Sequence, residues 1–134
     1  MSVTVISTEK APAAVGPYSQ AIRIAQMFPA GEGNMIYSSG QLGLDPATGK
    51  MVTGDFEAEV RQAFANLEAI VTEAGSTLGN AVKLTLFLTD LSQFATVNAI
   101  MKELVPEPFP ARTTIGVAAL PLGATFEIEG IFAA

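Results

Sequence analysis

Residues 82–88, with the sequence VKLTLFL, decide the fold, because they predict a β-strand that lies between two helices along the chain. Apolar and mixed positions alternate with the two-residue period of a strand. One face would carry Val82, Leu84, Leu86 and Leu88, and the other Lys83, Thr85 and Phe87. The first face suits a layer of helices. The second is half apolar, so we do not expect it to be fully exposed to water.

Helices flank this strand on both sides. Residues 55–74 place apolar side chains at successive steps of three or four, which is the period of one helix face. Asp55 fits an N-cap, and Gly75 fits a stop just beyond the last turn. A second helix is predicted over residues 92–104, and Pro106 would end it. Each helix has one apolar face, as a helix that covers a sheet requires.

Strands are also expected at residues 3–6, 21–27, 35–39, 113–117 and 125–132. The order along the chain is then βββαβαββ. The early pair and the late pair are expected to be hairpins, and crossovers would join the central strand to its neighbours. This predicts an α+β sandwich with one mixed sheet and both helices on one face. The 134 residues are expected to form a single domain, 1–134, whose other sheet face has no cover within the chain.

The composition removes many kinds of site. The sequence has no Cys and no His, which excludes disulfides, thiolate zinc sites and His-assisted catalysis. A transition-metal site is not expected, and the groups left for chemistry are Arg, Glu, Tyr, hydroxyls, backbone amides and water. Such a set suits a small carboxylated electrophile that is already primed for attack, such as an imine. It suits a protein that only binds a small acid equally well.

The charge balance narrows the choice of partners. Seven basic and thirteen acidic residues give a net charge of −6, and the basic residues are scattered. Nucleic acid and anionic membranes are disfavoured, because phosphates need clustered Lys and Arg. No apolar run approaches the ~20 residues of a membrane helix and no secretory signal pattern is seen, so the cytoplasm is expected. Charged residues make up only 15% of the chain, so other subunits are expected to cover part of its surface.

Three charged residues near the C-terminus are candidates for chemistry. Arg112 opens a strand, no further charge precedes Glu127, and a buried unpaired guanidinium is costly. Arg112 therefore either pairs with Glu127 or Glu129 as part of the structure, or holds a substrate carboxylate through a bidentate fork. Glu127 and Glu129 share one strand face, which fits either acid–base work or a solvated surface.

Seven short segments stand out along the chain: APAAVGPYSQA at 11–21, SGQ at 39–41, DPATG at 45–49, DLSQFATVN at 90–98, FPAR at 109–112, LP at 120–121 and EIE at 127–129. Taken together and in order, they resemble the RidA (YjgF) family of reactive-intermediate deaminases. Each segment is weak alone, but together they cover nearly the whole chain. The spacing from Arg112 to Glu127 also fits the family.

The resemblance implies a chorismate-mutase-like fold that assembles as a homotrimer, with active sites in the clefts between subunits. It implies hydrolysis of 2-imino acids, such as 2-iminobutanoate and 2-iminopropanoate, to 2-keto acids and ammonia, with no cofactor and no metal. These imines leak from pyridoxal-phosphate-dependent dehydratases. The implied partners are therefore the small imino or keto acid and further copies of the chain.

The same resemblance assigns roles to individual residues. Arg112 would hold the substrate carboxylate, while Glu127 and the backbone at Thr114 would place the attacking water. The residues that would line the cleft are Tyr18, Ser39, Gly40, Phe94 and Thr113, with Asn98 as a further candidate. Thr114 stands where the family often has Cys, and a role of the backbone would tolerate that difference.

Two features of the sequence differ from the pattern of the family. Residues 27–34 (MFPAGEGN) resemble an insertion in the early hairpin, and a loop there would change the substrate range if it leaned over the cleft. The segment before Phe109 is also a few residues short.

A non-catalytic sensor of small carboxylates remains an alternative, although it would gain nothing from Glu127. An RNA-acting protein or a chaperone is a third, and the net charge disfavours the former.

Overall fold

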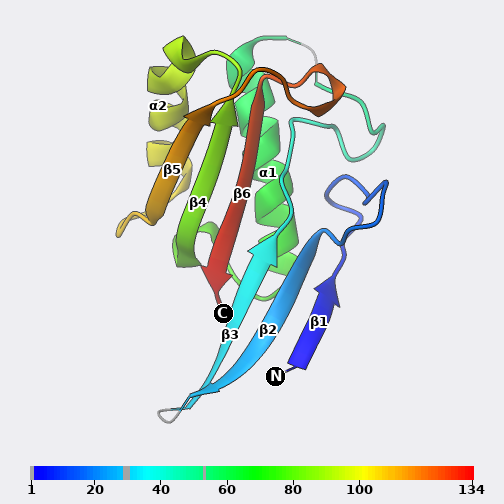
Figure 1. Ribbon diagram of the computed structural model, residues 1–134, viewed down its shortest axis with the longest axis vertical. Helices are drawn as coiled ribbons and strands as arrows, with labels where there is room; N and C mark the ends of the chain where they lie inside the picture. The colour runs from blue at the N-terminus through cyan, green and yellow to red at the C-terminus, as the bar shows by residue number, and fades with distance from the viewer. Residues whose placement is uncertain (1, 29–30, 53) are drawn as a thin grey trace.

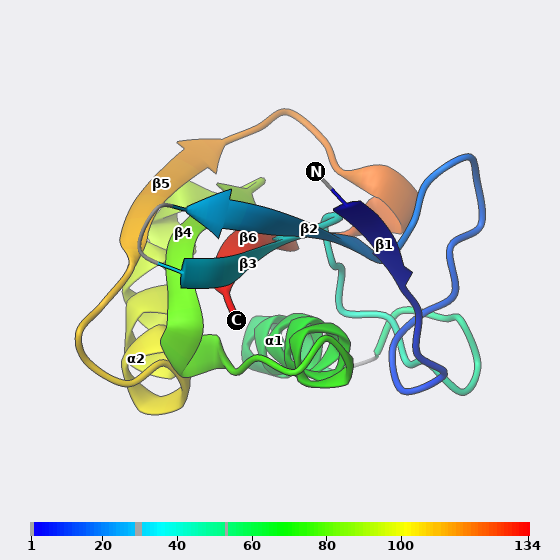
Figure 2. The same ribbon diagram turned by 90° about the horizontal axis from the view of Figure 1, so that it is seen from below.

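The computed structural model describes residues 2–28, 31–52 and 54–134, and within them six strands form one mixed sheet (Figure 1). The strands are β1 (Ser2–Ile6), β2 (Ala21–Phe28), β3 (Gly31–Ser38), β4 (Ala81–Leu88), β5 (Ala111–Gly116) and β6 (Phe126–Ala133). The helices α1 (Phe56–Glu73) and α2 (Phe94–Leu104) lie on the same side of the sheet (Figure 2). The α+β class and the order βββαβαββ are therefore confirmed.

Local signals place the helix ends. The Asp55 carboxylate accepts a hydrogen bond from the Ala58 amide at 2.9 Å, which confirms the N-cap of α1. Gly75 follows the helix with a φ of 81°, the left-handed conformation that glycine adopts most easily. Asp90 caps a short 3₁₀ turn, and α2 begins after it at Phe94, whereas the sequence predicted a helix from residue 92. None of the helices in the described ranges is long and apolar enough to cross a membrane.

The strand order across the sheet is β1-β2-β3-β6-β4-β5. The early hairpin is confirmed, because β2 and β3 pair antiparallel. The prediction of a late hairpin is wrong: β4 lies between β5 and β6, parallel to the first and antiparallel to the second. Helix α2 connects the parallel neighbours β4 and β5. The chain must therefore cross past β4 after β5, and it enters the sheet on the other side of β4 as β6.

The apolar core lies between the sheet and the two helices. Leu84, Leu86 and Leu88 of β4 are fully buried on this side, as the alternation in residues 82–88 predicted. From α1, the Phe64 ring stacks on Phe126 of β6 with 6.0 Å between centroids. This packing fixes which side of each strand faces the helices, and therefore where every polar side chain of the sheet points.

The opposite face of the sheet has no cover within the described chain (Figure 2). Its apolar half includes Val3 and Val5, which are 58% and 61% exposed, and Tyr37, which is 42% exposed. Its polar half is formed by Lys83, Thr85, Thr113, Glu127 and Glu129. Large apolar side chains in one exposed layer are typical of a surface that other subunits cover.

Residues 27–34, which resemble an insertion, lie at the far end of the β2–β3 hairpin, and the described ones among them belong to its two strands. The backbones of Met27 and Phe28 pair with those of Glu32 and Gly31, so these residues lengthen the β2–β3 hairpin. Pro29 and Ala30 lie outside the described residues. In Figure 1 this end of the hairpin points downward, whereas β6 begins at the upper end of the sheet. Within one chain, the extension therefore lies far from Glu127.

Candidate active site

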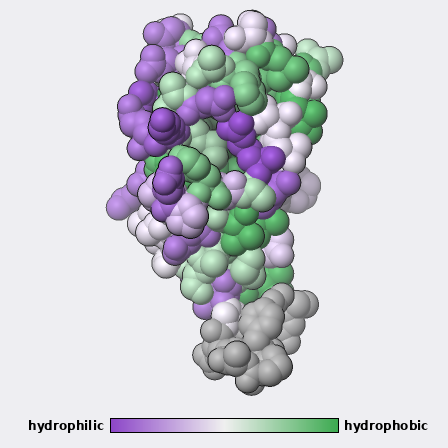
Figure 3. Space-filling model, turned by 90° about the vertical axis from the view of Figure 1, so that its left-hand side faces the viewer, coloured by the Kyte–Doolittle hydropathy of each residue, from purple (hydrophilic) through white to green (hydrophobic). Residues whose placement is uncertain are grey.

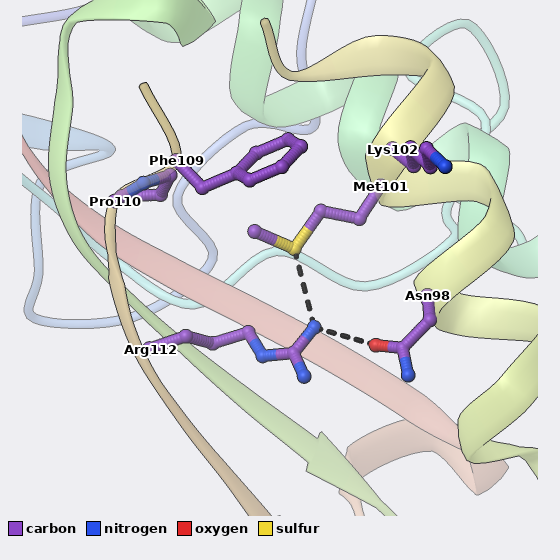
Figure 4. Close-up of a pocket in the computed structure, with 6 residues that line it drawn as sticks. All are labelled: Asn98, Met101, Lys102, Phe109, Pro110 and Arg112. Atoms are coloured by element: carbon purple, nitrogen blue, oxygen red, sulfur yellow. Dashed lines mark hydrogen bonds between the residues drawn. The ribbon is translucent and has the colours of Figure 1, made fainter. Parts of the chain in front are cut away.

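Arg112, the second residue of β5, points from the sheet towards α2 (Figure 4). Its Nη1 donates a hydrogen bond to Asn98 Oδ1 at 2.7 Å and lies 3.5 Å from the sulfur of Met101. The guanidinium carbon is 5.2 Å from the centroid of the Phe94 ring, a cation–π contact. The DLSQFATVN segment therefore contributes Phe94 and Asn98, one helical turn apart, to the same guanidinium.

A cavity of about 270 Å³ opens beside this guanidinium, lined by Asn98, Met101, Lys102, Phe109, Pro110 and Arg112. Two of these residues are cations and none is an anion. Among the described residues, Arg112 forms no ion pair, so the predicted structural pairing with Glu127 or Glu129 is wrong. A guanidinium held only by an amide, a thioether and a ring keeps its positive charge available to an anionic ligand.

Strand alternation explains why the pairing fails. Arg112 lies opposite Leu84 in the β5–β4 register, and Leu84 faces the helices. Glu127 lies opposite Phe87, on the uncovered face. The two charged side chains therefore emerge on opposite faces of the sheet. Within one chain they cannot close on the same small ligand.

Glu127 belongs to a second, larger cavity of about 750 Å³. Its wall includes Tyr18, Ser39, Gly40 and Glu127, which are four of the residues assigned to the cleft by the resemblance. Ser39 is held in place because its hydroxyl donates to the Ser19 carbonyl at 2.5 Å. The remaining wall is mostly apolar and comes from residues 12–15, 42–49 and 121–122.

Gly40 lets the backbone approach the Glu127 side chain closely. A Cβ built there would lie 2.9 Å from the carboxyl carbon of Glu127, and closer still to one carboxylate oxygen. The next residue fixes the approach, since Gln41 and Ile128 exchange two backbone hydrogen bonds of 2.7 and 3.0 Å. The SGQ segment therefore lets the chain run directly against the Glu127 carboxylate.

The electrostatic setting of Glu127 makes it a better base than an exposed glutamate. Burial raises the pKa of the Glu127 carboxyl above its ordinary value, and the neighbouring Glu129 charge raises it further. The higher pKa strengthens the carboxylate as a proton acceptor. Glu129 itself lies opposite Thr85, one row away from the cavity.

The two threonines after Arg112 point in opposite directions. Thr113 faces the uncovered side, where its hydroxyl accepts a hydrogen bond from Lys83 Nζ at 2.8 Å. Thr114 faces the helices with Arg112, and its buried hydroxyl has no hydrogen-bond partner among the described residues. The expected role of the Thr114 backbone, to place the attacking water, stays a prediction.

Sequence reasoning missed two residues at the Arg112 cavity, Met101 and Lys102. Met101 looked like an ordinary core residue of the apolar helix face, so no sequence signal distinguished it. Lys102 was not singled out, although it follows Asn98 by one helical turn. Figure 3 shows this side of the molecule, where apolar and hydrophilic surface alternate over β5 and α2. Phe94 and Phe109 contribute exposed apolar area.

The described residues contain no group of three or more Asp or Glu side chains placed to hold a metal ion. The polar groups at the two cavities are the Arg112 guanidinium, the Lys102 ammonium, the Glu127 carboxylate of raised pKa, side-chain amides, hydroxyls and backbone groups. Such a set binds a carboxylate and activates a water molecule.

Comparison with known proteins identifies the class. Residues 8–134 match the profile of the family described as Endoribonuclease L-PSP, and the chain belongs to this family, which is also called RidA/YjgF. A mouse relative, named 2-iminobutanoate/2-iminopropanoate deaminase, is 47% identical over 95% of this chain and 88% of its own length.

Solved structures agree with this assignment. RidA from the Antarctic bacterium Psychrobacter sp. PAMC 21119 superposes with a TM-score of 0.88 at 44% identity, over 98% of this chain and 99% of that chain. TdcF from E. coli, described with bound serine, superposes with a TM-score of 0.80 at 34% identity, over 98% of each chain.

Proposed function

We propose that the protein hydrolyses reactive 2-imino acids, such as 2-iminobutanoate and 2-iminopropanoate, to 2-keto acids and ammonia. The observation that carries the proposal is the Arg112 guanidinium, which has only neutral partners and lines an open cavity. The name of the mouse relative supports the reaction. The serine bound to the E. coli relative supports a site for a small molecule that carries an α-carboxylate.

Arg112 would take the substrate carboxylate through its guanidinium fork. Asn98 and Phe94 hold the guanidinium without neutralising it, so its interaction with an anion retains full strength. Binding by the carboxylate places the adjacent imine carbon at a fixed distance from the cavity wall. Positioning is the main demand on the enzyme, since an imine is an inherently reactive electrophile.

Glu127 would act as the general base. Its carboxylate accepts a proton from water as the water oxygen bonds to the imine carbon, and passes this proton to the imine nitrogen to give a carbinolamine. The carboxylate then takes the proton of the C–OH group and delivers it to the nitrogen as the carbon–nitrogen bond breaks, which leaves the ketone and ammonia. The backbone at Thr114 would hold the water in line, while Tyr18, Ser39, Gly40 and Thr113 shape the cleft.

The proposal includes a homotrimer with active sites between subunits. Arg112 and Glu127 emerge on opposite sheet faces, so a single chain supplies each side chain to a different surface. A neighbouring copy whose open face packs against the β5–α2 edge of the first would bring its Glu127 to the Arg112 cavity. The exposed apolar residues Val3, Val5 and Tyr37 support the same assembly. A cytoplasmic location, beside the dehydratases that release imines, completes the proposal.

The direct test couples the protein to a threonine or serine dehydratase. The rate of 2-keto acid release is measured while a scavenger competes for the imine. We expect wild type to accelerate release and Arg112→Ala to fail. If wild type has no effect but binds 2-keto acids, the protein is a carboxylate sensor and the proposed reaction is wrong. RNA binding that weakens steeply with salt would instead favour the activity named in the family description.

A further inference from the structure

A carboxylate outside the two cavities holds the beginning of β6. Glu59 lies in the first turns of α1, and its Oε2 accepts hydrogen bonds from the Thr125 amide at 2.7 Å and the Phe126 amide at 3.1 Å. Its Oε1 accepts a third, from the Thr125 hydroxyl, at 2.7 Å. All three donors belong to the two residues directly before Glu127. Because the acceptor is a charged carboxylate, these hydrogen bonds are stronger than those between neutral groups.

This contact provides hydrogen-bond acceptors for the backbone amides where the chain enters β6. The chain reaches β6 from the 3₁₀ turn Pro121–Gly123, and the side of Thr125 and Phe126 that faces α1 has no strand partner there. The Thr125 carbonyl is occupied on the other side, by the Thr89 amide at 3.2 Å. Without Glu59, two amide groups near the core would lose their acceptor, which is costly for partly buried donors.

Glu59 also contacts the opposite wall of the Glu127 cavity. A Cβ at Gly43 would lie 2.6 Å from the Glu59 carbonyl oxygen and 2.8 Å from its Cγ. The segment from residue 40 to residue 43 thus packs on Glu127 at one glycine and on Glu59 at the other. Asn66, two turns along α1, holds the same segment by donating to the carbonyls of Leu42 and Leu44 at 3.0 and 2.8 Å.

We propose that Glu59 is a positioning residue for Glu127, which fixes the start of β6 and the adjoining cavity wall so that the Glu127 carboxylate stays against Gly40. This inference rests on the proposed hydrolysis. Glu59 points towards β6 from the helix side, whereas the Glu127 side chain emerges on the other face, so the influence passes through the backbone. Glu59 touches no reacting atom.

The test compares Glu59→Ala and Glu59→Gln with the control Glu68→Ala, which removes an exposed carboxylate from the same helix. Gln keeps one oxygen for both amides, and its amino group donates to the Thr125 hydroxyl. We expect Glu59→Gln and the control to retain wild-type kcat. Glu59→Ala should lower kcat about tenfold, with KM changed less than about twofold, because Arg112 still holds the carboxylate.

A pH profile distinguishes a loss of Glu127 positioning from a general loss of rigidity in the protein. In Glu59→Ala, Glu127 should gain water contact, so the acid limb of kcat should move to lower pH, while it stays in place in Glu59→Gln. The titratable groups that share the uncovered face with Glu127 are Glu129 on β6, Lys83 on β4 and Tyr37 on β3. Tyr18 shares the cavity, and no other described residue of the cavity wall is titratable. The Glu59 variants leave these groups intact.

Several results would overturn the inference. They are an unchanged kcat in folded Glu59→Ala, an unmoved acid limb, or a Glu59→Gln variant as impaired as Glu59→Ala. If Glu59→Ala fails to fold, Thr125→Val removes only the hydroxyl contact and should lower kcat a few-fold with the same direction of pH shift. A wild type without deaminase activity refutes the proposed function itself, whereas an active wild type with indifferent variants refutes only the role of Glu59.

Discussion

Replacing Arg112 by Ala removes the group on which carboxylate binding depends. A guanidinium fork forms two charge-assisted hydrogen bonds, each worth about 1.5–3 kcal/mol to the complex. Their loss amounts to about 3–6 kcal/mol, and each 1.4 kcal/mol is a factor of ten, so kcat/KM should fall by about 10² to 10⁴. The fold should lose only about 1 kcal/mol, because the hydrogen bond to Asn98 has a neutral acceptor.

The assay is the dehydratase-coupled release of 2-keto acid, with folding checked by thermal unfolding. Lys102→Ala is the matched control, since Lys102 is a second cation at the same cavity. It should change kcat/KM less than about threefold, because its contribution is a screened charge rather than a fork. Arg112→Lys keeps the charge without the planar fork and should lie between Ala and wild type.

Two results would refute this reasoning. Arg112→Ala with wild-type kcat/KM would remove Arg112 from the site. Equal losses in Arg112→Ala and Lys102→Ala would show that the cavity acts through net charge, not through a specific fork.

Three further variants test separate features. The pKa of the Glu127 carboxyl is raised in the folded protein. Relative to an ordinary carboxyl, Glu127 therefore stabilises the fold only below its unfolded pKa near 4.5, and this contribution is lost as the pH rises through the folded pKa. Glu127→Gln should raise the Tm at pH 7, leave it unchanged at pH 4, and abolish activity. Thr114→Val removes a buried hydroxyl that lacks a partner among the described residues, and should stabilise the protein by about 1 kcal/mol in urea unfolding with activity retained. Leu122 has a φ of 57° and is 69% exposed, so Leu122→Gly should add about 0.5–1 kcal/mol in the same measurement, and a loss would contradict the strain argument.

Local patterns predicted the elements well. The alternation in residues 82–88 identified β4 and its buried face, and Asp55 and Gly75 marked the ends of α1, because these signals depend on neighbours in sequence. The prediction of a late hairpin failed because strands adjacent in sequence need not pair. The crossover through α2 makes β4 and β5 parallel neighbours, and β6 pairs with the other edge of β4. The extension at residues 27–34 has no long apolar alternation, so pairing across the hairpin was not visible.

Part of the candidate site could be predicted from the sequence, and part depends on the tertiary structure. Composition and the resemblance singled out Arg112 and Glu127, but their placement on opposite sheet faces depends on the register of β5 and β6 against β4. Glu59 could not be found from sequence, because a glutamate in the first turn of a helix is common and its partners lie 66 residues away. The three hydrogen bonds, and not the residue type, distinguish it.

The most direct test of the central claim mixes two inactive variants, Arg112→Ala and Glu127→Ala, by co-expression with different tags. If Arg112 of one subunit and Glu127 of another form each site, random mixed oligomers contain intact pairs at about a quarter of their sites, and a similar fraction of wild-type activity should return. Doubly tagged oligomers that remain inactive would contradict a site shared between subunits.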